Sequence, residues 1–142
     1  MKFGQRPPAG ARKTISFLRP LLEGPEAGLR LTNSRSGLVV AHQLLTAFDS
    51  ASRRTGLLHH DSLSDGCALL IAPSNAIHTF FMRFEIDVAF VKKDGRVLKT
   101  RHVLRPWRLA GALGAFVAIE LPAGALARSD TRPGDTLVIT RQ

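Results

Sequence analysis

The chain alternates between short apolar runs and clusters of turn-forming residues. The apolar runs occupy residues 38–45, 67–71, 77–84, 86–91, 97–104, 115–121 and 136–140, and proline, glycine, asparagine or aspartate residues separate most of them. Runs of this length with frequent punctuation are typical of antiparallel strands. The pattern therefore predicts a mainly β protein, a single compact antiparallel β-sandwich or barrel-like domain over residues 36–142.

One or two short helices interrupt this pattern. Asp49 or Ser50 can cap the first amides of a helix that runs through Arg54, and Gly56 can end it. Residues 125–128 can form one further helical turn. Long helical periods do not occur in the sequence.

Residues 1–35 differ from the rest, because they are rich in proline and glycine and carry seven basic residues against Glu23 and Glu26. We expect a basic, loosely ordered or surface-wrapping extension. Apolar residues at positions 15, 17, 18, 21 and 22 are the part that can dock on the β domain.

Length and cysteine usage set the broad class. With 142 residues, 44% of them hydrophobic, the chain can bury one core. The single Cys67 cannot form an internal disulfide, and no apolar run approaches the roughly 20 residues that span a bilayer. We expect a soluble, cytoplasmic protein without membrane insertion.

The formal charge of +9 would attract nucleic acids and other anionic partners. The basic residues are nevertheless scattered along the sequence, without a stripe in which aromatic and basic residues alternate. The sequence therefore favours a solvated basic surface over specific nucleic-acid binding.

Ionisable residues are concentrated in the apolar stretch 76–91, where a buried charge needs a partner. Asp94-Gly95 predicts a two-residue hairpin turn after it. Counting outward from this turn puts Ala89 opposite Thr100 and Asp87 opposite His102, with Cβ atoms roughly 5 Å apart. An Asp87–His102 pair can be a catalytic acid–base dyad or a buried structural pair, and the second is favoured because buried pairs commonly satisfy only each other.

Arg83 needs either water or an acid. Glu85, Asp87 and Glu120 are its candidate partners, and a ligand carboxylate or phosphate can replace any of them. His78 and Met82 share one face of a regular strand, but with Cys67 they make only a weak soft-metal pattern, so we expect no metal and no cofactor.

Trp107 lies between Arg105 and Arg108, and it can be either a lid over the core or an exposed platform for a ligand. The sequence contains no nucleophile elbow and no complete phosphate-binding loop. Whether the protein is an enzyme is therefore left open.

Five segments together resemble the domain of unknown function 192 (DUF192) family. They are residues 53–58 (RRTGLL), 77–90 (IHTFFMRFEIDVAF), 94–97 (DGRV), 120–124 (ELPAG) and 133–137 (PGDTL). The resemblance covers roughly residues 37–140. It implies a small, mainly β domain with a short helix, found in bacteria and archaea and without an established activity.

The family pattern is matched at Arg53, Gly56, Phe81, Met82, Arg83 and Asp87. Leu58 stands where many relatives carry methionine, and Glu85 where relatives usually carry proline. The resemblance also implies that many relatives have export signals, which this sequence does not show.

These observations predict a binding or accessory module for a small anionic ligand or a protein partner. The expected ligand-binding residues are Arg53, His78, Met82, Arg83, Asp87 and Trp107. The alternatives are a small hydrolase or transferase that uses Asp87 and His102, and a basic accessory protein that contacts nucleic acid through its amino-terminal arm.

Overall fold

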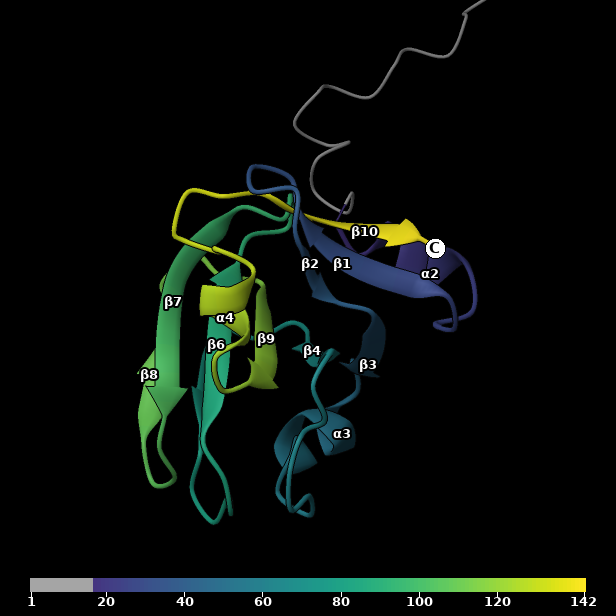
Figure 1. Cartoon of the computed structure of the whole chain (residues 1–142). Helices are drawn as coiled ribbons and strands as arrows, with labels where there is room; N and C mark the ends of the chain where they lie inside the picture. Colours follow the sequence, from purple (N-terminus) through teal and green to yellow (C-terminus); the bar gives the residue numbers. More distant parts are fainter. Residues whose placement is uncertain (1–16) are drawn as a thin grey trace, which may run out of the picture.

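The computed structural model describes residues 17–142, whose strands form three sheets (Figure 1). In chain order the elements are α2 (Arg19–Glu23), β1 (Leu29–Asn33), β2 (Val39–Ala41), β3 (Gln43–Ala47), α3 (Ser50–Thr55), β4 (Cys67–Ile71), β5 (Ala76–His78), β6 (Ile86–Val91), β7 (Val97–Leu104), β8 (Leu109–Gly111), β9 (Val117–Pro122), α4 (Ala125–Arg128) and β10 (Leu137–Arg141). The sheets have the orders β10-β1-β2, β3-β4-β9-β6-β7 and β5-β8.

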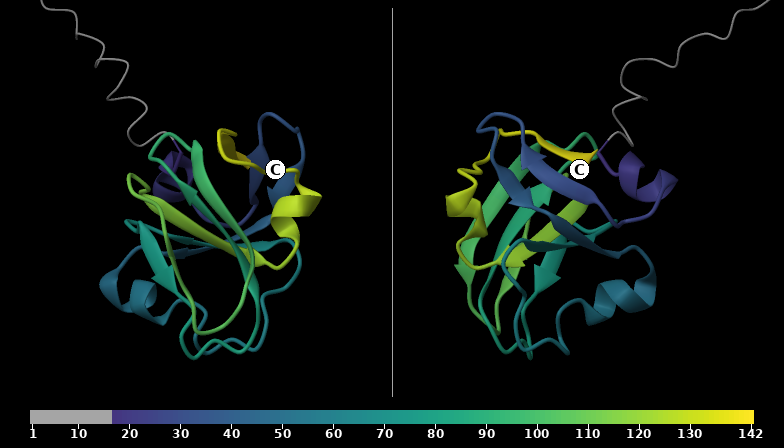
Figure 2. Two further views of the ribbon diagram at one scale, coloured as in Figure 1. Left: turned by 90° about the vertical axis from the view of Figure 1, so that its left-hand side faces the viewer. Right: turned by 45° about the vertical axis from the view of Figure 1, so that its right-hand side comes forward.

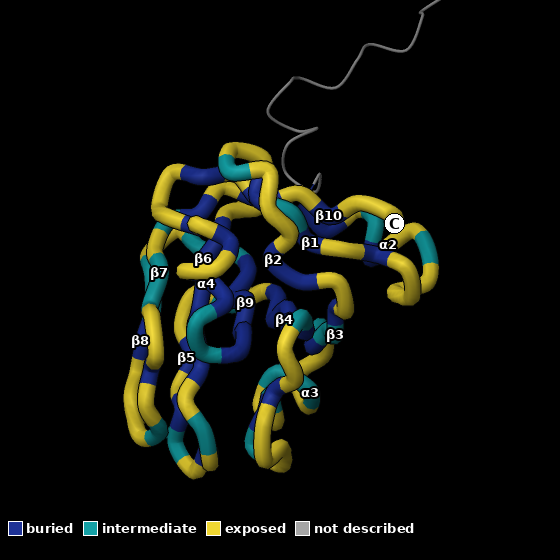
Figure 3. Tube along the Cα trace, viewed as in Figure 1, coloured by how far each residue is buried: buried dark blue, intermediate teal, exposed yellow. Residues whose placement is uncertain are grey.

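The five-stranded sheet is the centre of the molecule, because both of its faces are covered. Strands β4, β6 and β9 are buried at every position (Figure 3). Their even and odd side chains enter two separate apolar clusters, one containing Leu70 and Ile119 and the other containing Leu69 and Ala118. Burial on both faces explains why these strands are continuous apolar runs rather than alternating ones.

The mainly β class is confirmed, with three differences in detail. The pattern predicts one or two short helices, and residues 17–142 contain three. Strands β3 and β4 pair in parallel, not antiparallel. The long connection that carries α3 allows the chain to return and enter β4 in the same direction. Among residues 17–142 the sheets do not close into a barrel.

The folded domain begins earlier than the boundary predicted at residue 36. β1 pairs with both β10 and β2 (Figure 2). Leu29 and Leu31 on β1 are at most 1% exposed. Phe17, Leu18 and Leu21 are buried in the same apolar cluster. Residues 17–35 are therefore part of the β domain, because their apolar side chains complete its core. The extension expected over residues 1–16 lies outside the described residues.

The β6–β7 hairpin has a different turn from the expected one. Lys92 and Arg96 are joined by a backbone hydrogen bond of 2.9 Å, so three residues form the loop. Gly95 has φ +92°, and a Cβ there would lie 2.4 Å from the Leu137 carbonyl oxygen. A bulge between Phe90 and Val91 then shifts the register by one residue. The predicted pairing of Ala89 with Thr100 is confirmed because this bulge offsets the longer loop.

A buried polar cluster joins β1 of the three-stranded sheet to residues 130–135, the segment that precedes β10. Asn33 is fully buried and donates to Asp135 Oδ2 at 2.9 Å and to Thr131 Oγ1 at 3.2 Å. The hydrogen bond from Arg35 to Asp135 holds the pKa of that carboxyl well below its usual range. These contacts fix the turn that leads into β10.

If residues 17–22 belong to the core, Phe17→Ala should lower the free energy of unfolding by about 3 to 5 kcal/mol, because a side chain only 3% exposed leaves a cavity. Leu22→Ala is the matched control, since Leu22 is 60% exposed and should change stability by about 0.5 kcal/mol or less. Urea unfolding measures both. Equal small losses would show that this segment is not part of the core.

Candidate functional site

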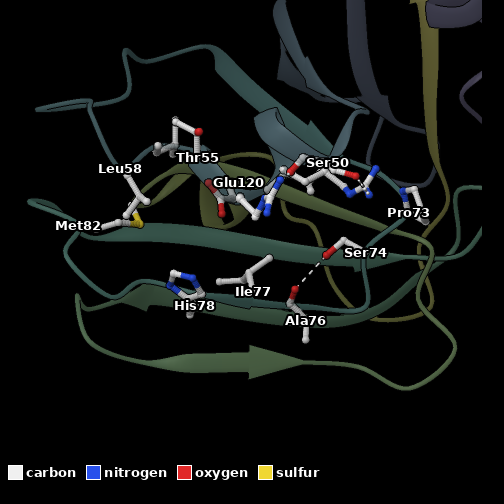
Figure 4. Close-up of a pocket in the computed structure, with 15 residues that line it drawn as sticks. Ser50, Thr55, Leu58, Pro73, Ser74, Ala76, Ile77, His78, Met82 and Glu120 are labelled. Carbon is white, nitrogen blue, oxygen red and sulfur yellow. Dashed lines mark hydrogen bonds between the residues drawn. The ribbon is translucent and has the colours of Figure 1, made fainter.

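A cleft of about 540 Å³ lies between α3, the β4–β5 connection and the outer side of the five-stranded sheet (Figure 4). Leu57, Leu58, Ile71, Ile77 and Met82 give it apolar walls. Its polar side chains are Ser50, Arg53, Arg54, Thr55, Ser74, His78 and Glu120. This volume and mixture of groups are typical of small-ligand sites.

The helix α3 presents the two arginines to the cleft. Asp49 caps it by accepting the Ser52 N–H at 2.8 Å, and this bond lowers the pKa of Asp49. Gly56, with φ +47°, ends it. The predicted capped helix with a terminal glycine is therefore confirmed. The helix fixes the backbone positions from which the side chains of Arg53 and Arg54 extend.

Arg53 is held in place from within its own segment. Its Nη1 donates to the Phe48 carbonyl oxygen at 2.8 Å and its Nη2 to Ser50 Oγ at 3.3 Å. A guanidinium has five N–H donors, so these bonds leave donors for a further acceptor. Arg53 is thus a pre-positioned cation at the wall of the cleft.

Glu120 is the acid of the cleft. It lies on the central strand β9 opposite Leu69 and Val88 and is only 3% exposed. Its Oε2 has no hydrogen-bond partner, and no ion pair within 4.0 Å joins it to Arg53 or Arg54. Figure 4 shows it in the middle of the labelled side chains.

Burial raises the pKa of Glu120 from 4.5 to about 7. Removing a carboxylate from water disfavours its charged form, and Arg53 and Arg54, which line the same cleft, form no ion pair with Glu120 that would offset this cost. Near neutral pH the group is therefore present in both forms. When protonated it donates a hydrogen bond, and when ionised it only accepts.

Of the six predicted ligand-binding residues, Arg53, His78 and Met82 line this cleft. His78 ends β5, and its Nδ1 accepts the Phe80 N–H at 3.3 Å. The expectation that residues 77–84 form one regular strand is wrong. The strand ends at His78, and Phe81 has φ +65°.

Arg83 lies outside the cleft and is 63% exposed. It forms an ion pair with Asp61, a residue of the connection between α3 and β4, and not with Glu85, Asp87 or Glu120. A pair in which both side chains are this exposed contributes little to stability. Its partner could not be found from the sequence, because Asp61 is distant along the chain.

Trp107 also lies outside the cleft. It is 56% exposed and packs beside Phe81, with ring centroids 4.6 Å apart. Trp107 is therefore not a lid over the core, and its role as a platform for a ligand stays a prediction. Arg83, Asp87 and Trp107, the other three expected ligand-binding residues, are thus not brought together with Arg53 in this cleft.

Asp87 is fully buried and does not pair with His102. Its Oδ1 accepts the Val103 N–H at 2.8 Å, and its Oδ2 accepts the N–H groups of Gly124 at 3.1 Å and Leu126 at 3.0 Å. A second bulge, between Ile86 and Val88, moves the register so that His102 is exposed. The dyad hypothesis is wrong. Asp87 binds backbone amides and caps the start of α4.

Sequence reasoning named Glu120 only as a partner for Arg83 and missed its place in the cleft. The available signal was an acid inside the apolar run 115–121, which the structure buries as β9. Such an acid must be neutralised, paired or functional.

Two further properties concern the described part of the chain alone. Within residues 17–142, no three His, Cys, Asp or Glu side chains gather as a metal site would require. In the same residues no helix has the length and apolarity needed to cross a membrane. Cys67 is buried and lies 3.4 Å from the Gln43 side-chain oxygen.

The family model DUF192, described as an uncharacterized ACR, matches residues 31–139. No curated protein sequence matches the chain significantly. Two crystal structures share the fold. A protein of unknown function from Novosphingobium aromaticivorans is 24% identical with a TM-score of 0.66, and the match covers 77% of this chain and 81% of that one. A candidate transcription regulator from Sinorhizobium meliloti is 21% identical with a TM-score of 0.67, covering 77% and 89%.

Asp87→Ala should lower the free energy of unfolding by about 3 kcal/mol or more, because three buried N–H groups lose their acceptor. His102→Ala should change it by about 0.5 kcal/mol or less, since that side chain is exposed. Urea unfolding of the two variants decides the matter. Similar losses of stability in both variants would contradict this conclusion and support an Asp87–His102 pair.

Glu120 should make stability fall with rising pH. Because its folded pKa is raised, its favourable contribution is fully present below pH 4.5 and is lost as the pH rises through about 7. The free energy of unfolding of the wild type, relative to Glu120→Gln, should therefore drop by about 2 to 3 kcal/mol between pH 5 and pH 8. Denaturant titrations at several pH values measure this difference. A difference that does not vary with pH would mean that Glu120 has an ordinary pKa.

Proposed function

The chain belongs to the DUF192 family, and from its cleft we propose that it binds a small anionic molecule that also carries a hydroxyl or amino group. The observation that carries this proposal is Glu120, a buried carboxyl with an unpartnered oxygen on the wall of a cleft. A buried polar atom without a partner costs about 1 to 3 kcal/mol, so a ligand that supplies the partner recovers that free energy on binding.

The anionic part of the ligand follows from the arginines. Arg53 and Arg54 line the same cleft, and neither forms an ion pair within 4.0 Å with a described carboxylate. Arg53 is fixed by Phe48 and Ser50, which reduces the side-chain entropy that binding would cost. A carboxylate or phosphate accepts the remaining guanidinium donors.

The hydroxyl or amino part follows from Glu120 and its surroundings. A ligand donor satisfies the ionised carboxylate, and a ligand oxygen satisfies the protonated acid. Thr55, Ser74 and His78 add further polar atoms to the walls, while Ile77 and Met82 supply apolar contact. The volume of about 540 Å³ suits a metabolite of modest size better than a peptide or a large cofactor.

We further expect this binding to take place in the cytoplasm. The reason is the single cysteine, Cys67, which is buried and carries no disulfide in the described domain. The fold therefore needs no oxidising compartment to be stable.

Isothermal titration with three probes tests the two parts of the ligand separately. Glycerol 3-phosphate carries an anion and hydroxyls, inorganic phosphate carries the anion, and glycerol carries hydroxyls alone. We expect the affinity to fall in that order. Arg53→Gln should weaken the affinity for glycerol 3-phosphate about tenfold or more, because a hydrogen bond to a charged group is lost.

Arg30→Gln is the matched control, since Arg30 is exposed on β1, outside the cleft. Glu120→Gln should weaken the affinity for glycerol 3-phosphate but leave the affinity for inorganic phosphate unchanged. Failure of both phosphate-bearing probes to bind, or equal affinity of Arg53→Gln and Arg30→Gln for them, would contradict the proposal.

A further inference from the structure

A second surface, outside the cleft, carries two exposed aromatic side chains and one half-buried one beside a basic hollow. Phe80, Phe81 and Trp107 form what we call the aromatic platform. They come from the β5–β6 connection, residues 79–85, and the β7–β8 connection, residues 105–108, which lie side by side at the lower edge of Figure 1. The proposed function uses none of these three rings.

Thr79 holds the two connections together. It is fully buried, and its Oγ1 donates to the Arg105 carbonyl oxygen at 2.6 Å and accepts the Arg108 N–H at 2.9 Å. Its carbonyl oxygen accepts the Trp107 N–H at 3.0 Å. The position of Trp107 is therefore set by a buried cross-link and not by its own burial.

The backbone presents the rings outward at a cost. Phe81 and Trp107 both have φ +65°, a region that side chains with a Cβ rarely adopt and that costs on the order of 1 kcal/mol or more. Their rings remain 70% and 56% exposed. Neither burial nor backbone preference accounts for this arrangement, which indicates that the rings contact something outside the chain.

The rings form a continuous row. Phe81 and Trp107 have centroids 4.6 Å apart with planes tilted by 57°, and Phe80 stacks on Trp107 at 5.8 Å. His78 stacks on Phe80 at 4.9 Å. Phe80 is half-buried in this row, whereas Phe81 and Trp107 are exposed and can provide stacking surfaces for flat groups such as nucleobases.

The basic hollow lies directly beside the platform. It has a volume of about 280 Å³ and is lined by Arg101, His102, Arg105 and Arg108 together with Val103 and Leu104. No carboxylate lines it. Arg105 lies 3.9 Å from Glu85, and Arg108 donates to the Trp107 carbonyl oxygen at 3.3 Å. Most of the guanidinium donors are left for an external anion.

We propose that the aromatic platform and the basic hollow together bind single-stranded nucleic acid, with bases stacked on Phe81 and Trp107 and a backbone phosphate in the hollow. Aromatic faces and cations at adjoining positions are the two parts that single-strand sites combine. The sequence disfavours this partner because its aromatic and basic residues are scattered. The fold brings them together from two connections.

The positions of the cations favour a nucleic acid over a membrane. A bilayer-binding surface projects its apolar rings into the lipid and keeps its charges behind them. Here Arg105 and Arg108 lie within two residues of Trp107, one on each side of it in the sequence. Inserting the Trp107 ring into a bilayer would therefore carry their charges into the lipid. A flexible single strand can instead place phosphates and bases alternately along such a surface.

Fluorescence anisotropy with a fluorescein-labelled oligothymidylate tests the proposal on the full chain. Trp107 is the single tryptophan, so base stacking should also quench the intrinsic fluorescence. Trp107→Ala should weaken binding about tenfold. Trp107→Phe, which keeps a ring, should retain most of the affinity. Leu113→Ala is the control, because Leu113 is fully exposed outside the platform and should bind as the wild type does.

The salt dependence tests the hollow. Arg108→Gln should reduce the slope of log affinity against log salt concentration by about 0.7, the value for one phosphate contact to a single strand. Arg30→Gln should leave the slope unchanged. Urea unfolding should show that every variant keeps the stability of the folded chain, so that lost binding reflects lost contacts.

Several results would overturn the proposal. One is binding that persists in Trp107→Ala and disappears only when Lys2, Arg6, Arg12 and Lys13 are all changed to glutamine. Others are equal affinity for duplex DNA, or binding of phosphatidylglycerol vesicles without binding of the oligonucleotide. None of these outcomes depends on whether the cleft binds a small anion, so the two proposals stand or fall separately.

Discussion

The carboxylate of Asp87 is the interaction on which the rest of the arrangement depends. From a fully buried position on β6 it accepts three backbone N–H groups, one from the bulged end of β7 and two from the start of α4. A buried carboxylate is tolerated because these donors replace water. The same bonds fix the point at which the chain leaves β9, the strand that carries Glu120, and so connect the scaffold to the cleft.

The two buried acids of the central sheet differ in whether the chain supplies their hydrogen-bond partners. Asp87 and Glu120 lie on neighbouring strands, but their side chains enter different faces of the sheet. Asp87 lies on the face that is covered by the three-stranded sheet and α4, and Glu120 lies on the face that is covered by α3. Asp87 has all its partners within the chain, whereas Glu120 has an oxygen with none. This difference agrees with the structural interpretation that the sequence favours for Asp87, although with different partners, and it supports the proposal that Glu120 belongs to a binding site.

Features encoded locally could be predicted from the sequence. Strands β4, β6, β7, β9 and β10 follow from apolar runs, and the capped helix α3 follows from Asp49 and Gly56. Features set by distant residues could not. The pairing of β1 with β10 and the Arg83–Asp61 ion pair join segments that are far apart in the chain, and the two bulges of the β6–β7 hairpin are irregularities that the alternating pattern does not reveal. The shift at Ile86 and Val88 alone separates Asp87 from His102. The sequence leaves Trp107 as either a lid or a platform, because nothing near it in sequence reveals the Thr79 cross-link.

The central claim is that Glu120 is a buried acid left unpaired for a ligand. It is tested most directly by a carbon-13 NMR titration of the side-chain carboxyl groups, with the Glu120 resonance assigned by its absence from Glu120→Gln. We expect a midpoint at about pH 7, because burial disfavours the carboxylate. A midpoint close to the ordinary value of 4.5 would show that water or a cation already stabilises the charged form, and would contradict the account.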